Sequence, residues 1–331
     1  MRRRQFLGVL GGAAAAWPCA AMAQGQKHAS RVGLLMELAE NDSQARSNVA
    51  ALQRGLRRLG WIEGRNLAID YRWTSKDPVL VWKYAKELVE LRPDVIVTHS
   101  TPGASTLLGQ TRSIPILFVS ISDPVGEGFV ASFARPSANI TGFTNFESSM
   151  TGKWVELLKM IAPNTSRVAF LFNPQATAGA GAYFMDPIDA AVSAQKIGSA
   201  MALVHDDEGI EATFAALSRV PGAGVVVLPD IFTASHHQLI ISKAAQYRVP
   251  TVYNYRFMVE RGGLISYGVD LDNLFERVAT YVNRILRGEN ITDLPVQAPT
   301  NFELVINLKT ARSLGLTVPD RLIVAADEVI E

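Results

Sequence analysis

Residues 32–36, Val-Gly-Leu-Leu-Met, are a short apolar run, and the polar stretch Glu40-Asn41-Asp42-Ser43 follows it. After this stretch, apolar residues recur with spacings of 3, 4 and 3 at Val49, Leu52, Leu56 and Leu59. The run is typical of a buried β-strand, and the spacing is typical of an amphipathic helix that ends near Gly60. The sequence therefore predicts a strand, a loop with a capping residue, and a helix.

The same unit recurs in the following residues. Apolar runs at 67–71, 95–97 and 116–119 alternate with helical patterns at 80–91 and 104–110. Strands that alternate with helices indicate a parallel sheet that is covered on both faces.

Proline and glycine interrupt this rhythm over residues 123–147, which we interpret as a crossover between two lobes. A second series follows, with apolar runs at 168–172, 202–204, 225–228 and 251–252 and helical patterns between them. The fold class predicted is α/β, with two Rossmann-like lobes whose parallel sheets are joined by a hinge of several crossings.

The composition excludes several classes of protein. The chain has 331 residues, of which 48% are hydrophobic, and 32 Lys+Arg balance 31 Asp+Glu. So much apolar surface excludes a disordered chain, and the neutral balance argues against a nucleic-acid partner. The single cysteine, Cys19, excludes an intramolecular disulfide or a Cys-rich metal cluster.

The first 23 residues have the pattern of a cleaved signal peptide. Arginines at 2–4 precede a run of small and apolar residues, which ends at Ala21-Met22-Ala23. The string Arg3-Arg4-Gln5-Phe6-Leu7 resembles a twin-arginine motif, although Arg-rich signals are common and the export route stays open. We therefore predict a periplasmic protein, and Trp17-Pro18 before Cys19 fit a lipoprotein signal poorly.

Polar residues directly after the predicted strands are candidates for ligand contacts, because open parallel sheets bind ligands at the carboxyl ends of their strands. Each could equally be a helix cap or a turn residue. The candidates are Asn41, Asp42, Ser100, Thr101, Ser122, Asp123, Asn173, Asp230 and Tyr253.

Enzyme motifs are weak in this sequence. No G-x-S-x-G elbow, Walker A loop or H-E-x-x-H helix occurs. The adjacent His236 and His237 lack a third ligand at the usual spacing. We therefore predict no catalytic residue, no metal site and no cofactor.

Three groups of motifs, in order along the chain, resemble a known family. They are Leu59-Gly60-Trp61-Ile62-Glu63-Gly64-Arg65-Asn66-Leu67, Asp123-Pro124-Val125 with Asn139-Ile140-Thr141-Gly142, and Leu294-Pro295-Val296-Gln297. In these motifs the chain is similar to the ABC-transporter substrate-binding family that includes the tryptophan- and tyrosine-binding lipoproteins. The resemblance implies a type I periplasmic-binding-protein fold with three crossings between the lobes. It also implies delivery of a small solute to a membrane permease and its ATPase.

The resemblance further implies roles for individual residues. By analogy with branched-chain amino-acid binding proteins, Asp123 would hold a ligand ammonium, and Ser100 or Thr101 would hold a ligand carboxylate, with Asp230 as a second acid.

We expect lobe one to comprise residues 30–122 and about 254–290. Lobe two and the hinge would comprise 123–253 and about 291–331.

The function expected is capture of an amino-acid-like solute or an aromatic acid between the lobes of a monomer. Two alternatives from other classes are a ligand-sensing partner of a membrane receptor and an exported α/β enzyme.

Overall fold

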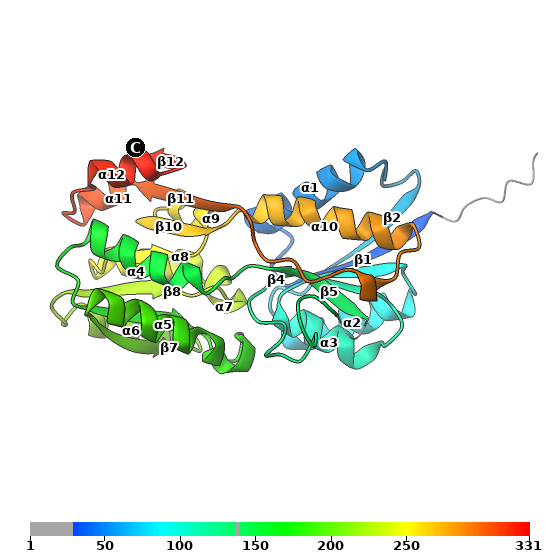
Figure 1. Ribbon diagram of the computed structural model, residues 1–331, viewed down its shortest axis with the longest axis horizontal. Helices are drawn as coiled ribbons and strands as arrows, with labels where there is room; N and C mark the ends of the chain where they lie inside the picture. Colours follow the sequence, from blue (N-terminus) through cyan, green and yellow to red (C-terminus); the bar gives the residue numbers. More distant parts are fainter. Residues whose placement is uncertain (1–28, 137–138) are drawn as a thin grey trace, which may run out of the picture.

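The computed structural model describes residues 29–136 and 139–331. The chain forms two α/β lobes that lie side by side along the long axis of the molecule (Figure 1). The predicted signal peptide, residues 1–23 with the twin-arginine string, lies outside the described residues. In the part that is described, no helix is long and apolar enough to cross a membrane.

Lobe one is built on a five-stranded parallel sheet with the strand order β2-β1-β3-β4-β5. Its strands are β1 (Ser30–Met36), β2 (Leu67–Trp73), β3 (Val95–His99), β4 (Ile116–Ile121) and β5 (Ile140–Thr144). Its helices are α1 (Ser43–Arg58), α2 (Pro78–Glu90), α3 (Thr101–Gln110) and α10 (Leu271–Leu286). Helices α1 and α10 pack together against one face of the sheet, and α2 and α3 cover the other face.

Lobe two is built on a seven-stranded sheet with the order β12-β11-β10-β9-β8-β6-β7. Among the described strands of this sheet, the pairing of β10 with β11 is antiparallel and the others are parallel. Its strands are β6 (Arg167–Phe172), β7 (Gly198–Leu203), β8 (Ala223–Val227), β9 (Thr251–Tyr253), β10 (Ile265–Val269), β11 (Phe302–Asn307) and β12 (Glu328–Ile330). Its helices are α4 (Ser149–Ile161), α5 (Ala182–Gln195), α6 (Asp207–Leu217), α7 (Ile231–Ser235), α8 (His237–Gln246), α9 (Arg256–Glu260), α11 (Leu308–Ser313) and α12 (Asp320–Ala325). Two short 3-10 turns complete the elements, η1 (Ala178–Gly181) in lobe two and η2 (Ile291–Asp293) beside β5.

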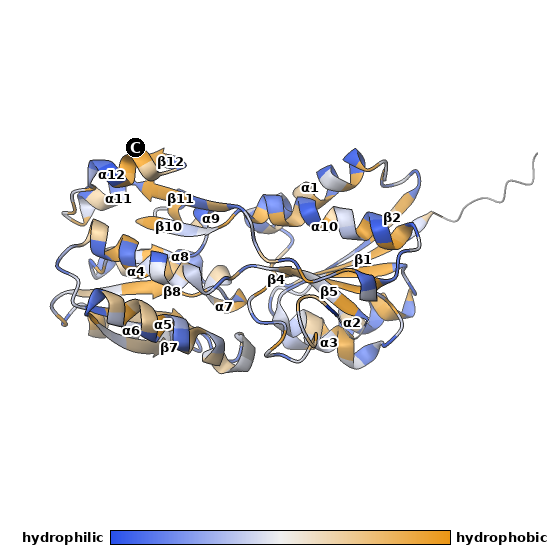
Figure 2. Ribbon diagram, viewed as in Figure 1, coloured by the Kyte–Doolittle hydropathy of each residue, from blue (hydrophilic) through white to orange (hydrophobic). Residues whose placement is uncertain are grey.

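The strands are largely apolar, and the helices show one apolar and one polar face (Figure 2). One buried apolar cluster runs from α1 and α10 in lobe one to α6, α8 and α9 in lobe two. Two further clusters fill the remaining sheet faces. Each sheet is therefore buried on both sides, as the alternation of strands and helices predicted.

Aspartates begin several of the helices. The Asp42 carboxylate accepts the amides of Gln44 and Ala45 at the start of α1, and the Asp270 carboxylate accepts the Asn273 amide at the start of α10. Such caps satisfy backbone donors that have no partner within the helix. For Asp42, the structure thus supplies the capping role that the sequence left open beside a ligand role.

Two of the expected lobe boundaries differ from the structure. Strand β5, within the range assigned to lobe two and the hinge, belongs to the first sheet, and β10, within the range assigned to lobe one, belongs to the second. A Cβ at Gly142 of β5 would lie 2.0 Å from the Phe118 carbonyl oxygen, so the glycine permits a close approach to β4. Strand β10 stays in lobe two because β9 and β11 pair with its two edges.

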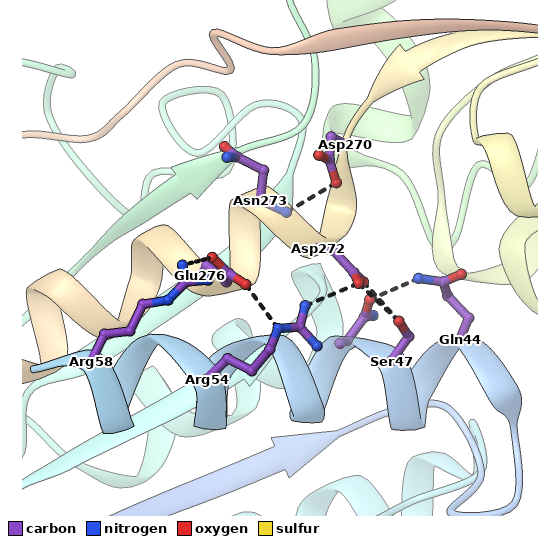
Figure 3. Close-up of polar contacts among 9 residues, drawn as sticks. Gln44, Ser47, Arg54, Arg58, Asp270, Asp272, Asn273 and Glu276 are labelled. Atoms are coloured by element: carbon purple, nitrogen blue, oxygen red, sulfur yellow. Dashed lines mark hydrogen bonds and ion pairs between the residues drawn. The ribbon is translucent and has the colours of Figure 1, made fainter. Parts of the chain in front are cut away.

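Helices α1 and α10 cross at Gly55. A Cβ at Gly55 would lie 2.7 Å from both the Ala279 Cβ and the Glu276 carbonyl oxygen. Arg54 and Arg58 of α1 pair with Asp272 and Glu276 of α10 along the same contact (Figure 3). These pairs are partly exposed, so we assign most of the stabilisation to the buried apolar contact at the crossing.

Gly55→Ala tests this crossing. We expect the added methyl group to force α1 away from α10 and to lower the free energy of unfolding by about 1–3 kcal/mol. Gly152→Ala in α4 is the matched control, because a Cβ there meets no atom within 4 Å. The control should raise stability by roughly 0.5–1 kcal/mol through helix propensity. Urea unfolding of both variants makes the comparison, and equal shifts would contradict a tight crossing.

Candidate ligand-binding site

A cleft lies between the lobes where the carboxyl ends of the two sheets meet. It encloses about 30 Å³ of space, and residues of both lobes line it. A space of this size holds about two water molecules, so the lobes must separate to admit a larger ligand. The polar side chains in the lining are Gln44, Asn48, His99, Ser100, Thr101, Ser120, Ser122, Asn145, Thr177, Asp230 and Tyr255.

Ser100 forms part of the lobe-one wall, directly after β3. Its backbone has φ 113° and ψ 162°, a conformation that a residue with a Cβ rarely adopts. Its hydroxyl donates a hydrogen bond to the Glu37 carboxylate, which follows β1 and is 2% exposed. The Gly103 amide, in the first turn of α3, bonds the same carboxylate. Burial raises the pKa of Glu37 to about 7, against the lowering effect of these two hydrogen bonds.

A hydrogen-bonded cluster links the two lobes on the hinge side of the cleft. The Asn145 amide nitrogen, after β5, donates to the Ser120 hydroxyl at 2.9 Å and to the Tyr255 hydroxyl at 2.8 Å. The Ser122 hydroxyl donates to the Asn145 side-chain oxygen at 3.0 Å. Tyr255 follows β9 of lobe two, so Asn145 holds the lobes together at the site itself.

Asp230 forms part of the lobe-two wall, after β8. Its two carboxylate oxygens accept the backbone amides of Thr233 at 2.7 Å and Asn173 at 3.0 Å. Burial raises its pKa to about 7, although these amides favour the charged form. The side chain caps α7 and ties that helix to the end of β6.

Two buried polar atoms of residues in the lining have no hydrogen-bond partner among the residues that the structure describes. They are the Asn48 side-chain nitrogen on α1 and Nδ1 of His99 at the end of β3. The Gln44 side-chain nitrogen donates a hydrogen bond of 2.9 Å to the Asn48 side-chain oxygen. Burial lowers the pKa of His99 to about 4, so its ring is neutral at neutral pH. Unpaired buried polar atoms are rare, and in a cleft they are available to a ligand.

The structure brings together four of the nine predicted residues, namely Ser100, Thr101, Ser122 and Asp230. Asn41 and Asp42 line a neighbouring cavity at the rim. The remaining three predicted residues, Asp123, Asn173 and Tyr253, are absent from the lining of both cavities.

Each of these three has another role or position in the structure. The Asp123 carboxylate accepts the Gly126 amide in a turn at 2.7 Å, and the Asn173 side-chain oxygen accepts the Gln175 amide at 2.8 Å. Tyr253 lies in the apolar core.

Several residues in the lining were not predicted. Asn48 lies on the second turn of a helix and His99 is the last residue of a strand, so a search for polar residues after strands passes over both. Asn145 was missed because β5 was not predicted. Tyr255 lies two residues beyond the predicted Tyr253.

The described residues give no sign of a metal centre. Within 29–136 and 139–331, no group of three or more His, Cys, Asp or Glu side chains could hold a metal ion.

A model of the family described as ABC transporter substrate binding protein matches residues 35–330. The chain belongs to this family. The tyrosine-binding protein of Clostridioides difficile (strain R20291) is 24% identical to this substrate-binding protein over 272 residues, which cover 80% of this chain and 75% of the relative.

Two solved structures show the same fold over 91% of this chain and 99% of their own. A conserved domain protein from Vibrio cholerae is 28% identical, with a TM-score of 0.84. An ABC domain from Streptococcus pneumoniae in complex with L-Trp is 24% identical, with a TM-score of 0.83. The predictions of the family, of the type I periplasmic-binding-protein fold and of a substrate-binding role for an ABC transporter are confirmed.

The raised pKa values of Glu37 and Asp230 predict how stability depends on pH. The folded protein holds these protons up to about pH 7, whereas unfolded carboxyl groups release theirs near pH 4. The stabilising contribution of these two groups is therefore greatest below the unfolded pKa, near pH 4, and is lost as the pH rises through about 7. Each group contributes up to about 3 kcal/mol to the change in the free energy of unfolding over this pH range.

Glu37→Gln removes one of these groups. We expect the slope of unfolding free energy against pH to become shallower between pH 5 and 8, as measured by urea unfolding. Glu87→Gln, which alters an ion pair with Arg72 elsewhere on lobe one, should keep the wild-type slope. Parallel curves for wild type and Glu37→Gln would contradict the assignment.

Proposed function

We propose that this substrate-binding protein captures an aromatic amino acid, tyrosine or tryptophan, in the interlobe cleft and delivers it unchanged to a permease and its ATPase. The observation that carries the proposal is the pair of unpartnered buried atoms, on Asn48 and His99, in a cleft to which both lobes contribute. A ligand held there would complete hydrogen bonds that the protein leaves open.

The lining suits an amino acid with a large side chain. Neutral hydrogen-bonding groups occupy part of the wall, and Leu38, Ile231, Phe257 and Leu271 offer apolar surface. The rings of Tyr255 and Phe257 are stacked, with centroids 5.6 Å apart. Relatives whose names specify tyrosine or L-Trp support the same ligand class.

The proposal includes the cellular location and the mode of action. The signal-peptide pattern of residues 1–23 supports export to the periplasm, by the twin-arginine or the general route. The protein would act as a monomer that binds its solute, with no role for a cofactor or for nucleic acid.

Contacts across the rim support capture by closure of the two lobes. Arg261, after α9, donates to the Ser43 hydroxyl at the start of α1. The Glu127 carboxylate of lobe one accepts the Gly179 amide of lobe two at 3.1 Å. These side chains are exposed or half-exposed, so water can replace the contacts when the lobes separate. A ligand that contacts both walls would shift the population toward the closed form.

A thermal-shift screen of the twenty L-amino acids tests the proposal. We expect tyrosine or tryptophan to raise the Tm, since a ligand at a hundredfold excess over Kd adds about 2.7 kcal/mol of stability. Mass spectrometry should recover the bound ligand chemically unchanged. No shift with any amino acid would contradict the ligand class, and product formation would contradict the transport role.

Asn48→Ala tests the site itself. Loss of a hydrogen bond to a charged ligand group should weaken binding about tenfold or more in isothermal titration. Asp123→Ala is the control, because Asp123 caps a turn and is absent from the cleft lining. Weaker binding by Asp123→Ala alone would instead favour the acid implied by the resemblance.

A further inference from the structure

The start of α3 already holds a carboxylate of the protein itself. In the first turn of this helix, Pro102 has no N–H to offer a ligand. The Gly103 amide donates a hydrogen bond to the Glu37 carboxylate. The Ala104 amide bonds the Ser100 carbonyl oxygen at 3.3 Å. A ligand carboxylate placed here would lie beside a buried like charge, which is unfavourable. These contacts argue against the expectation that Ser100 or Thr101 holds a ligand carboxylate.

The Ser100 hydroxyl has a fixed polarity. Above the Glu37 pKa of about 7 the carboxylate is ionised and can only accept, so Ser100 donates its one hydroxyl hydrogen to Glu37 and only its lone pairs remain for a ligand. A ligand group that meets Ser100 must therefore donate a hydrogen bond. An ammonium group does so and is also attracted by the Glu37 charge behind the serine.

Hydrogen-bond donors are available elsewhere in the cleft. The Asn145 amide gives a hydrogen to each of the Ser120 and Tyr255 hydroxyls. These two hydroxyls lie 3.3 Å apart and can use only one of their own hydrogens between them. The second hydroxyl hydrogen of this pair therefore remains available to a ligand. Among the described residues, the Asn48 amide nitrogen has no partner either.

The charges in the lining agree with an acceptor at Ser100 and donors elsewhere in the cleft. Among the described residues that line the cleft there is no lysine or arginine, so a ligand carboxylate must rely on neutral donors. Asp230 also lines the cleft, and the amides of Thr233 and Asn173 offset its charge.

We propose that Glu37 is a positioning residue that fixes the orientation of the ligand. It turns Ser100 into an acceptor for the ligand ammonium, and it directs the ligand carboxylate toward Asn48 and the Ser120–Tyr255 pair. The inference rests on the proposed function, since it concerns an amino acid in the same cleft. It reverses the assignment that the resemblance implied for lobe one.

The test uses three matched probes, namely L-tyrosine, tyramine, which lacks the carboxylate, and 3-(4-hydroxyphenyl)propionate, which lacks the amine. The corresponding tryptophan set is L-tryptophan, tryptamine and indole-3-propionate. Isothermal titration at about pH 8, above the Glu37 pKa of about 7, measures the binding of each probe to wild type and to Glu37→Gln. If no probe of either set binds wild type, the proposed function fails, and the orientation fails with it. Every other result concerns the orientation alone.

Glu37→Gln should weaken the two amine-bearing probes about tenfold and leave the amine-free probe unchanged, because only an ammonium senses the lost charge. Equal weakening of all three probes would show a merely structural role and overturn the proposal. Tighter binding of the amine-free probe alone would place the carboxylate at Ser100 and also overturn it. Glu87→Gln carries the same chemical change on the outside of lobe one and should bind all three probes as wild type does.

Ser100→Gly keeps the proposal testable if Glu37→Gln does not fold. Glycine tolerates the backbone conformation at φ 113°, so this variant should fold, yet it lacks the acceptor. We expect it to weaken the amine-bearing probes and spare the amine-free one. Selective weakening of the amine-free probe would overturn the orientation.

Discussion

The close contact of α1 with α10 at Gly55 is the constraint on which the two-lobe arrangement depends. Helix α10 follows β10 of the second sheet in the chain, yet it packs on the first sheet. The polypeptide must therefore cross between the lobes before α10 and again after η2, in addition to the crossing between β5 and α4. Connections at three points limit the relative motion of the lobes and keep the carboxyl ends of both sheets facing one cleft.

The cleft that results has buried acids within it and directly behind its wall. Glu37 in lobe one and Asp230 in lobe two each accept hydrogen bonds from backbone amides, and burial raises the pKa of each to about 7. With no basic side chain among the described lining residues, the site relies on the direction of its hydrogen bonds. The polarity of each hydroxyl and amide then matters more than the number of polar groups present.

The sequence predicted the strands that carry long apolar runs, because burial on both faces demands such runs whatever the surroundings. It failed for β5, which contains Gly142, since the place of this strand depends on the approach of that glycine to Phe118. It also failed to find Glu37, because an acid directly after an apolar strand is read as the beginning of a polar loop. Asp123 and Asp230 look alike in sequence, each after a strand, and only tertiary packing places one in a turn and the other in the cleft wall.

Backbone strain points to the same hydroxyl groups. Ser100 and Ser120 both have positive φ, at 113° and 66°, and both line the cleft. Such conformations cost about 1–3 kcal/mol for residues with a Cβ, and glycine would avoid most of that cost. A glycine would lack the hydroxyl that bonds Glu37 in one case and Asn145 in the other. The hydroxyls of these strained serines make hydrogen bonds that glycine could not make, which accounts for serine at both positions in the cleft lining.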